Sequence, residues 1–185
     1  MSILRGEDVP ATPWKNGMGR TRELAIHPAG ADLRNFTWRV SVAEVDRAAP
    51  FSAFPGVDRQ IALLDGEGFL MRFDDGREHA LLAPFVPFAF PGEAAVDATL
   101  AGGPTRDFNL MLRRGSATGS IEAWRAGAHA LEGIVLVHAA RGEAMTPEGL
   151  LRPGDTWQVP AAFARDRLTL HGDAILLAVH ITTDV

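Results

Sequence analysis

Apolar and polar side chains alternate along most of the chain. Over residues 36–42 every second position is apolar, and Arg39 and Ser41 lie on the polar side. The same alternation recurs over residues 107–113. A period of two residues predicts β-strands, because successive side chains of a strand point to opposite faces of a sheet. Further strands are predicted at 58–65, 67–73, 77–82, 86–90, 94–100, 119–125, 133–138, 156–159, 166–171 and 174–182.

Short strands and frequent turns leave little room for helices. Asp74-Asp75-Gly76 predicts a tight hairpin turn, and the best short helix candidate is 145–151. Many short strands at close spacing predict an all-β protein, either a sandwich or a barrel. Short apolar matches favour two similar β-units, and they pair 61–64 with 134–137 and 81–84 with 150–153.

Composition and charge narrow the class of protein. The chain has 185 residues, 46% hydrophobic and 22% charged, which suits one full core or two small ones. Its 18 basic and 23 acidic side chains give a net charge of −5, which argues against nucleic acids and anionic membranes as partners. Cysteine is absent, which excludes disulfides, cysteine-ligated metals and thiol nucleophiles. The first residues do not resemble a signal peptide and no stretch suits a membrane span, so we expect a soluble cytoplasmic protein.

The single lysine lies in the densest cluster of Trp, Asn, Gly and charge in the chain. Arginine outnumbers lysine by seventeen to one, and Lys15 stands between Trp14 and Asn16. An ammonium is a compact charge with a readily shifted pKa, whereas a guanidinium is a flat, permanent fork. A site that needs an ammonium would resist the bias toward arginine, and Gly17 and Gly19 would aim backbone amides at an anion. A solvated lysine on an ordinary turn is the alternative.

Three further groups of side chains are candidates for a site. Arg39 and Ser41 would form an anion site if their strand face lines the interior of a barrel, because arginine offers paired donors to a carboxylate. Asp107 and Asn109 would place an acceptor and an amide in a pocket. On an open sheet both pairs would be ordinary surface residues. The dense stretch 51–59 is either part of the site or a hydrophobic corner with a local ion pair.

Neither a metal site nor a nucleophile is predicted. The six histidines include no close pair, and the sequence has no Gly-x-Ser-x-Gly motif. We therefore predict no cofactor, no metal and no catalytic residue.

The order and spacing of the motifs resemble the HutD/Ves family. The resemblance is carried by the segments 14–17, 21–23, 38–41, 51–59, 64–68 and 107–109. The usual loop of the family reads Trp-Lys-Asn-Gly-Gly-Gly, and this chain has Met18 at the middle glycine.

The resemblance implies a cupin fold, with two β-barrel halves packed together as a bicupin. Residues 1–118 would hold the N-terminal segment and the first barrel, and residues 119–185 a second, degenerate barrel half, within one compact unit. Metal-binding cupins carry paired histidines where this chain has residues 54–60 without a histidine. A metal-dependent dioxygenase is therefore not expected.

The resemblance also implies a link to histidine utilisation, in which the protein binds an intermediate such as formylglutamate and senses or limits the pathway. We expect a small anionic metabolite as partner, and a homodimer fits the fold. Lys15 and Arg39 would hold carboxylates, Asn16 and Ser41 would supply neutral hydrogen bonds, and Glu23 would orient a cation or receive an amide. The full set of expected ligand-binding residues is Trp14, Lys15, Asn16, Arg22, Glu23, Trp38, Arg39, Ser41, Phe51, Phe54, Asp58, Arg59, Asp107 and Asn109.

Two other functions stay open. A metal-independent isomerase or hydrolase acting on a small acidic metabolite would use Lys15 or Glu23 as general acid or base. A structural or interaction module would make the same motifs a signature of the fold.

Overall fold

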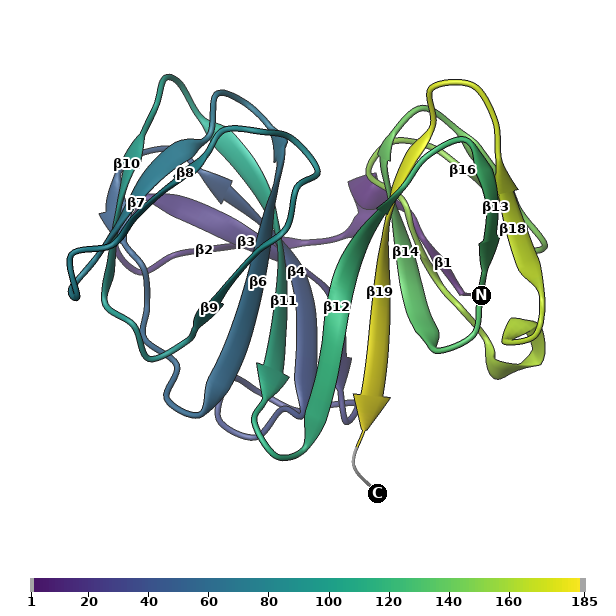
Figure 1. Cartoon of the computed structure of the whole chain (residues 1–185), viewed down its shortest axis with the longest axis horizontal. Helices are drawn as coiled ribbons and strands as arrows, with labels where there is room; N and C mark the ends of the chain where they lie inside the picture. Colours follow the sequence, from purple (N-terminus) through teal and green to yellow (C-terminus); the bar gives the residue numbers. More distant parts are fainter. Residues whose placement is uncertain (1, 184–185) are drawn as a thin grey trace. The chain divides into compact units, whose positions relative to one another are not determined.

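The computed structural model describes residues 2–183, and the regular structure in that range is almost entirely β (Figure 1). Nineteen strands are accompanied by two 3-10 helices, η1 (Gly6–Asp8) and η2 (Ala161–Phe163). Within residues 2–183 no helix is long and apolar enough to cross a membrane. The prediction of an all-β protein is confirmed. The chain divides into two compact units, one of residues 11–117 and one of residues 2–10 with 118–183.

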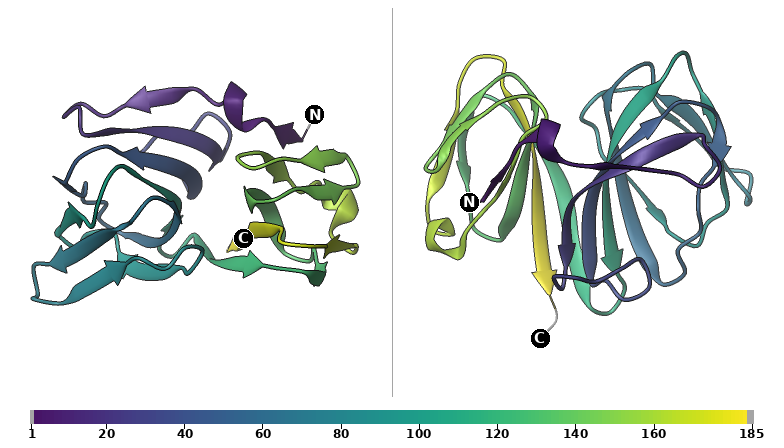
Figure 2. Two further views of the ribbon diagram at one scale, coloured as in Figure 1. Left: turned by 90° about the horizontal axis from the view of Figure 1, so that it is seen from above. Right: turned by 180° about the vertical axis from the view of Figure 1, so that it is seen from behind.

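The unit of residues 11–117 contains two sheets (Figure 2), and apolar side chains on their facing sides share a core. The six-stranded sheet has the order β2 (Ala11–Pro13), β3 (Gly19–His27), β4 (Trp38–Val45), β11 (Thr105–Arg113), β6 (Val57–Asp65) and β9 (Phe88–Pro91). The four-stranded sheet has the order β5 (Ala49–Pro50), β10 (Val96–Leu100), β7 (Phe69–Phe73) and β8 (Glu78–Leu81). Side chains from both sheets form the core, and Ile61, Leu63, Phe69 and Met71 are fully buried in it.

The other unit is built around a five-stranded sheet. Its order is β1 (Ile3–Leu4), β17 (Thr156–Gln158), β14 (Ile134–Arg141), β19 (Ile175–Thr183) and β12 (Ala117–Trp124). Two further strand pairs complete the unit, β13 (Gly127–Ala130) with β18 (Arg167–Leu170) and β15 (Ala144–Thr146) with β16 (Gly149–Leu151). Its core is apolar and includes Val137, Leu151, Trp157 and Leu176, each fully buried.

The strand pairings of the two units correspond to each other. β6 pairs with β9 and β11, as β14 pairs with β17 and β19. The pair β7–β8 corresponds to β15–β16, and the pair β5–β10 corresponds to β13–β18. The matching sequence segments 61–64 and 134–137 fall in the corresponding strands β6 and β14. In the part of the chain that the structure describes, none of the sheets closes into a barrel.

The structure confirms the predicted hairpin turn at 74–76 and shows that the predicted helix at 145–151 is wrong. The hairpin turn at 74–76 is confirmed, since β7 and β8 pair on either side of it and Gly76 has a φ of 86°. Residues 145–151, predicted as a helix, form the hairpin β15–β16 instead. Pro147 lacks the N–H that a helix interior needs, and Gly149 has a φ of 136°, so the chain turns here.

Candidate functional site

Strand register places polar side chains of several strands on the inner face of the six-stranded sheet. On β11, Met111 lies opposite both Arg39 of β4 and Arg59 of β6. Asn109 of β11 lies opposite Ser41 of β4. Residues directly opposite each other in neighbouring strands point to the same face. We call the group on this face the inner-face cluster, and its members are Glu23, Arg39, Ser41, Arg59, Asp107 and Asn109.

Arg59 is the most enclosed cation of this cluster. It is 9% exposed, and its Nη2 donates to Oδ1 of Asn109 at 3.2 Å. The Asn109 amide in turn donates to Oδ2 of Asp107, so the three side chains form a hydrogen-bonded chain. The rings of Phe51, Phe54 and Phe90 lie 5.3, 5.6 and 4.9 Å from the Arg59 guanidinium carbon. Aromatic faces attract a guanidinium, so these rings hold the cation in an otherwise apolar setting.

Burial shifts the pKa values of both charged ends of this chain. It lowers the pKa of Arg59 from 12.5 to about 10, against the opposing effect of Asp107 and with a smaller contribution from the nearby charge of Arg39. Burial raises the pKa of Asp107 from 3.8 to about 7, although Asn109 and Arg59 both favour its ionised form. At neutral pH the cluster therefore holds a charged Arg59 beside a carboxyl that is only partly ionised.

Arg39 lies nearer to solvent and is paired with an acid. Its Nε donates to Oε2 of Glu23 at 2.8 Å, and its Nη1 donates to Oγ of Ser41 at 3.4 Å. The Arg39 side chain is 13% exposed, whereas that of Glu23 is 44% exposed. Glu23 is therefore the more solvated member of this ion pair, and Arg39 the more enclosed one.

Two buried polar atoms of the cluster have no hydrogen-bond partner. They are Nε of Arg59 and Oδ1 of Asp107. Within residues 2–183 every other buried side-chain nitrogen or oxygen atom has a hydrogen-bond partner. Buried polar atoms in folded proteins are almost always paired. The two atoms are therefore the clearest indication of a ligand in this unit.

The corresponding strands of the other unit lack such a cluster. β14 and β19 direct Val137, Ala139, Leu176 and Ala178 into an apolar core with Trp157. Of the two similar units, the one formed by residues 11–117 thus holds the charged interior. Within residues 2–183 no three His, Asp or Glu side chains are grouped to hold a metal ion.

Several other predicted residues lie around the same face. Phe51 and Phe54 cover Arg59, as described above. Trp14 donates from Nε1 to Oγ1 of Thr21 at 2.8 Å, and Thr21 lies opposite Ala43, a neighbour of Ser41 on the inner face. Trp14 therefore lies at the edge of the inner face.

Lys15 and Asn16 belong to the turn before β3. The Lys15 side chain is exposed. Oδ1 of Asn16 accepts the amide of Met18 at 3.0 Å, which stabilises the turn. Met18 takes the place of the usual glycine without strain, since the positive φ falls on Gly17, at 69°. Gly19 is required by close approach, because a Cβ there would lie 2.4 Å from the carbonyl oxygen of Glu44.

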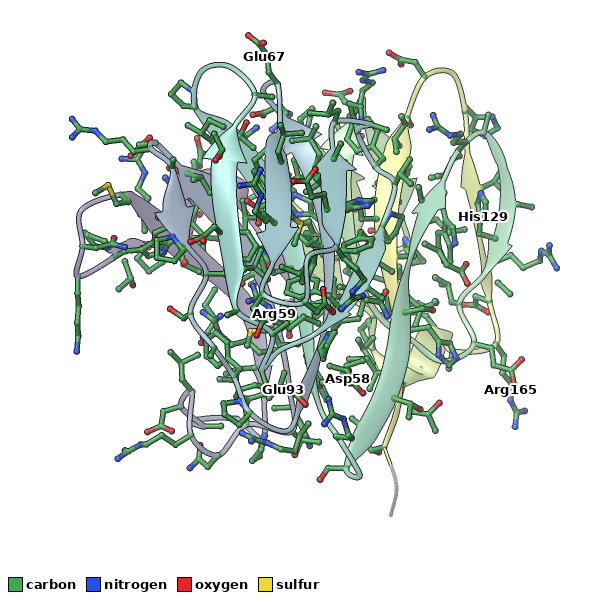
Figure 3. All side chains as sticks on the ribbon, turned by 60° about the vertical axis from the view of Figure 1, so that its left-hand side comes forward. Asp58, Arg59, Glu67, Glu93, His129 and Arg165 are labelled. Atoms are coloured by element: carbon green, nitrogen blue, oxygen red, sulfur yellow. The ribbon has the colours of Figure 1, made fainter. Side chains whose placement is uncertain are left out.

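Three predicted residues point away from the inner face. Arg22 precedes Glu23 on β3 and donates from Nε to Glu44 at 2.7 Å. Trp38 alternates with Arg39 on β4 and so lies on the opposite face, as the sequence pattern predicted. Asp58, next to Arg59 on β6 (both labelled in Figure 3), accepts a hydrogen bond from Arg114 at 2.7 Å.

Phe90 and Met111 were missed as site residues. Phe90 lies opposite Arg59 in register, and Met111 separates Arg59 from Arg39. The signal for Phe90 was the alternation over 86–90, which puts it on one face of a strand. The pairing of that strand with β6 is a long-range contact, however, and the sequence alone did not reveal it.

Comparison with known proteins gives one family match over most of the chain. The HutD family model matches residues 6–176. An uncharacterized 21.2 kDa protein in the hutC 3′ region of Pseudomonas putida is 42% identical over 111 residues, which is 60% of this chain and 57% of that protein. Protein Ves of Citrobacter koseri is 39% identical over 107 residues, 57% of this chain and 54% of that protein. The match thus spans somewhat over half the length of these relatives.

Solved structures extend the likeness to the whole fold. HutD from Pseudomonas fluorescens SBW25, solved in a formate condition, has a TM-score of 0.84 and 30% identity, covering 100% of this chain and 99% of that one. A cupin 2 conserved barrel domain protein from Leptotrichia buccalis has a TM-score of 0.62 at 8% identity, covering 97% and 96% of the two chains. The second comparison establishes a cupin-like fold and nothing about function.

Proposed function

We propose that this chain, which belongs to the HutD family, binds small molecules that carry a carboxylate at the inner-face cluster. The observation that carries the proposal is a pair of arginines on one sheet face, of which Arg59 is buried and Arg39 is partly buried. Arg39 and Arg59 flank Met111, so their Cα atoms lie two strand spacings apart, about 10 Å. The guanidinium fork matches a carboxylate, and two such forks suit a small acid with one or two carboxylates.

The acids already in the cluster compensate these charges incompletely. Glu23 contacts Arg39 but is half exposed. Asp107 reaches Arg59 only through Asn109, and its pKa of about 7 leaves it partly protonated at neutral pH. Buried charge is costly unless it is paired, so an anionic ligand would be favoured at both arginines.

The names of the relatives suggest a metabolic setting for the proposal. One relative is named for the hutC region, and a similar solved structure carries the name HutD. We therefore extend the proposal to an acidic intermediate of histidine utilisation, such as formylglutamate, whose binding senses or limits that pathway. Its two carboxylates would engage Arg39 and Arg59.

The proposal also covers the architecture. The corresponding strand pairings of the two units support two cupin-like barrel halves, a bicupin, in which the first half ends near residue 118 and the second is degenerate. The second half would have a structural role, since its corresponding strands direct apolar side chains into the core.

A metal-independent isomerase or hydrolase is the second candidate function. One observation favours it, namely the pKa of Asp107 at about 7, which suits a general acid or base near neutral pH. Incubating the protein with small acidic metabolites, followed by mass spectrometry, separates the two functions. A new species that forms only with active protein would support the enzyme, and unchanged metabolites would support binding alone.

Calorimetric titration tests the binding proposal. N-formyl-L-glutamate, L-glutamate and glutarate would be titrated into the wild type, Arg39→Gln and Arg59→Gln. The control is Arg34→Gln, which removes the same charge from a side chain that is 90% exposed in the same unit.

We expect one or more acids to bind the wild type and Arg34→Gln, and to bind either cluster variant at least about tenfold more weakly, as expected for loss of a charge-assisted pair. Because Arg59 is buried, Arg39→Gln carries the test if Arg59→Gln does not fold. Equal affinity in all four proteins would contradict the proposed site.

A further inference from the structure

From the two unpartnered atoms of the inner-face cluster, we infer that the ligand is a carboxylic acid that also carries an N–H group, and that Asp107 is the residue that recognises this N–H. The inference rests on the proposed function and narrows its class of ligand. It also assigns a specificity role to a side chain that contacts neither arginine directly.

Asp107 has one oxygen in use and one free. It is 2% exposed, and its Oδ2 accepts the amide of Asn109. Its Oδ1 is buried without a partner. In the ionised form of Asp107, which Asn109 and Arg59 favour, both oxygens only accept hydrogen bonds, so the free Oδ1 needs a donor from a ligand. An acceptor left unpaired inside a protein is costly, and this cost is what a ligand N–H would remove.

Arg59 has an unpaired donor, whereas Asp107 has an unpaired acceptor. Its Nη2 donates to Asn109 at 3.2 Å and its Nη1 to the carbonyl of Ser52 at 3.5 Å, while its Nε has no acceptor. The hydrogen-bonded chain thus leaves a free donor on Arg59 and a free acceptor on Asp107. A simple carboxylate accepts hydrogen bonds only, so it would satisfy Nε of Arg59 and leave Oδ1 of Asp107 unpaired.

The charge of Asp107 also favours an N–H group of the ligand over a second carboxylate. A second carboxylate placed against Asp107 would add a negative charge to a buried acid, whereas an amide or ammonium N–H would not. Glu23 cannot take the place of Asp107 as a buried acceptor, because its side chain lies beside Arg39 and is half exposed. Asp107 is thus the acid of the cluster that can distinguish a donor from an acceptor inside the unit.

Access to these atoms requires movement of the residues that cover them. Arg59 is covered on one side by Phe90 of β9 and on the other by residues 51–54, which form no strand and supply the rings of Phe51 and Phe54 and the carbonyl of Ser52. The segment is held by the amide of Phe51 on Val96 at 2.8 Å and that of Phe54 on Gly92 at 2.7 Å. Displacement of the side chains between these anchors would expose Arg59 while the strands stay in place.

Two ligands with the same skeleton test the inference. Glutaramate and 5-oxohexanoate each carry one carboxylate, and they differ only in an NH2 group where the ketone has a methyl group. We expect the wild type to bind glutaramate about tenfold or more tightly than 5-oxohexanoate, because a site built to pair a donor rejects an analogue that lacks it.

Asp107→Asn then tests the assignment of the residue. The variant keeps the size of the side chain and can still accept from Asn109, but its second atom becomes a donor. The preference for glutaramate should fall to about one or reverse. The matched control is Asp97→Asn, the same change at an exposed position of β10, which should keep the wild-type preference.

The outcomes separate the two proposals. If the wild type binds glutaramate and 5-oxohexanoate equally, the inference is overturned without any variant, while binding that is lost in Arg39→Gln still supports the proposed function. A preference that survives in Asp107→Asn likewise overturns the role of Asp107. If neither these compounds nor any of the three acids of the calorimetric titration bind the wild type, the proposed function fails and the inference fails with it.

Discussion

Replacing Asp107 by asparagine should change how the stability of the protein depends on pH. Asp107 is buried, and its pKa in the folded protein is raised from 3.8 to about 7. The folded state therefore holds this proton more tightly than the unfolded state does. It follows that the free energy of unfolding falls as the pH rises from the unfolded value through the folded one, and that the loss is complete above the folded pKa.

The size of the effect follows from the shift. A difference of roughly three units, at about 1.4 kcal/mol for each unit, gives ~4 kcal/mol over the whole range. Roughly 2–3 kcal/mol of this falls between about pH 5 and about pH 8. Asparagine does not titrate, so Asp107→Asn avoids the loss. The stability of the variant relative to the wild type should rise by this amount as the pH rises.

Urea denaturation followed by the fluorescence of the four tryptophans measures this difference at both pH values. Titrations common to both proteins cancel in the comparison, and so does any constant effect of the substitution. Asp97→Asn is the control, because this exposed position should give the same difference at both pH values. A change smaller than about 1 kcal/mol for Asp107→Asn would refute the argument that burial controls this carboxyl.

Three further substitutions test other parts of the site. Glu23→Gln frees Arg39 from its half-exposed partner and should tighten binding of a carboxylate by about threefold in calorimetry, whereas weaker binding would mean that Glu23 itself contacts the ligand. Gly19→Ala places a Cβ 2.4 Å from the Glu44 carbonyl oxygen and should lower the free energy of unfolding by about 2 kcal/mol or more in urea, and an unchanged midpoint would contradict the close approach. Lys15→Ala, at an exposed turn, should weaken binding by less than about threefold, and a loss of about tenfold would put its ammonium on the ligand.

The local pattern of the strands could be predicted from the sequence. Alternation over 36–42 put Arg39 and Ser41 on the face opposite Trp38, and β4 has this arrangement. Alternation over 107–113 likewise put Asp107 and Asn109 on one face of β11. These predictions succeeded because the period of a strand is a property of the chain itself.

The assembly of the site could not be predicted in the same way. Arg59 and Asn109 are 50 residues apart in the chain, and their hydrogen bond depends on the register between β6 and β11. Strand β3 was not predicted at all, since its sequence is polar and a register shift between Glu23 and Ala25 interrupts the alternation. Arg22 and Glu23 were predicted as one group, and the strand separates them onto opposite faces.

Nuclear magnetic resonance of the arginine side chains tests whether a carboxylate ligand binds at both Arg39 and Arg59. The Nε–H signals of Arg39 and Arg59 can be assigned by comparison with Arg39→Gln and Arg59→Gln, and glutaramate then titrated into the wild type. We expect both signals to shift together along one binding curve and the signal of the exposed Arg34 to stay in place. Binding that leaves the signals of Arg39 and Arg59 unchanged would contradict this expectation, because the ligand would then lie outside the inner-face cluster.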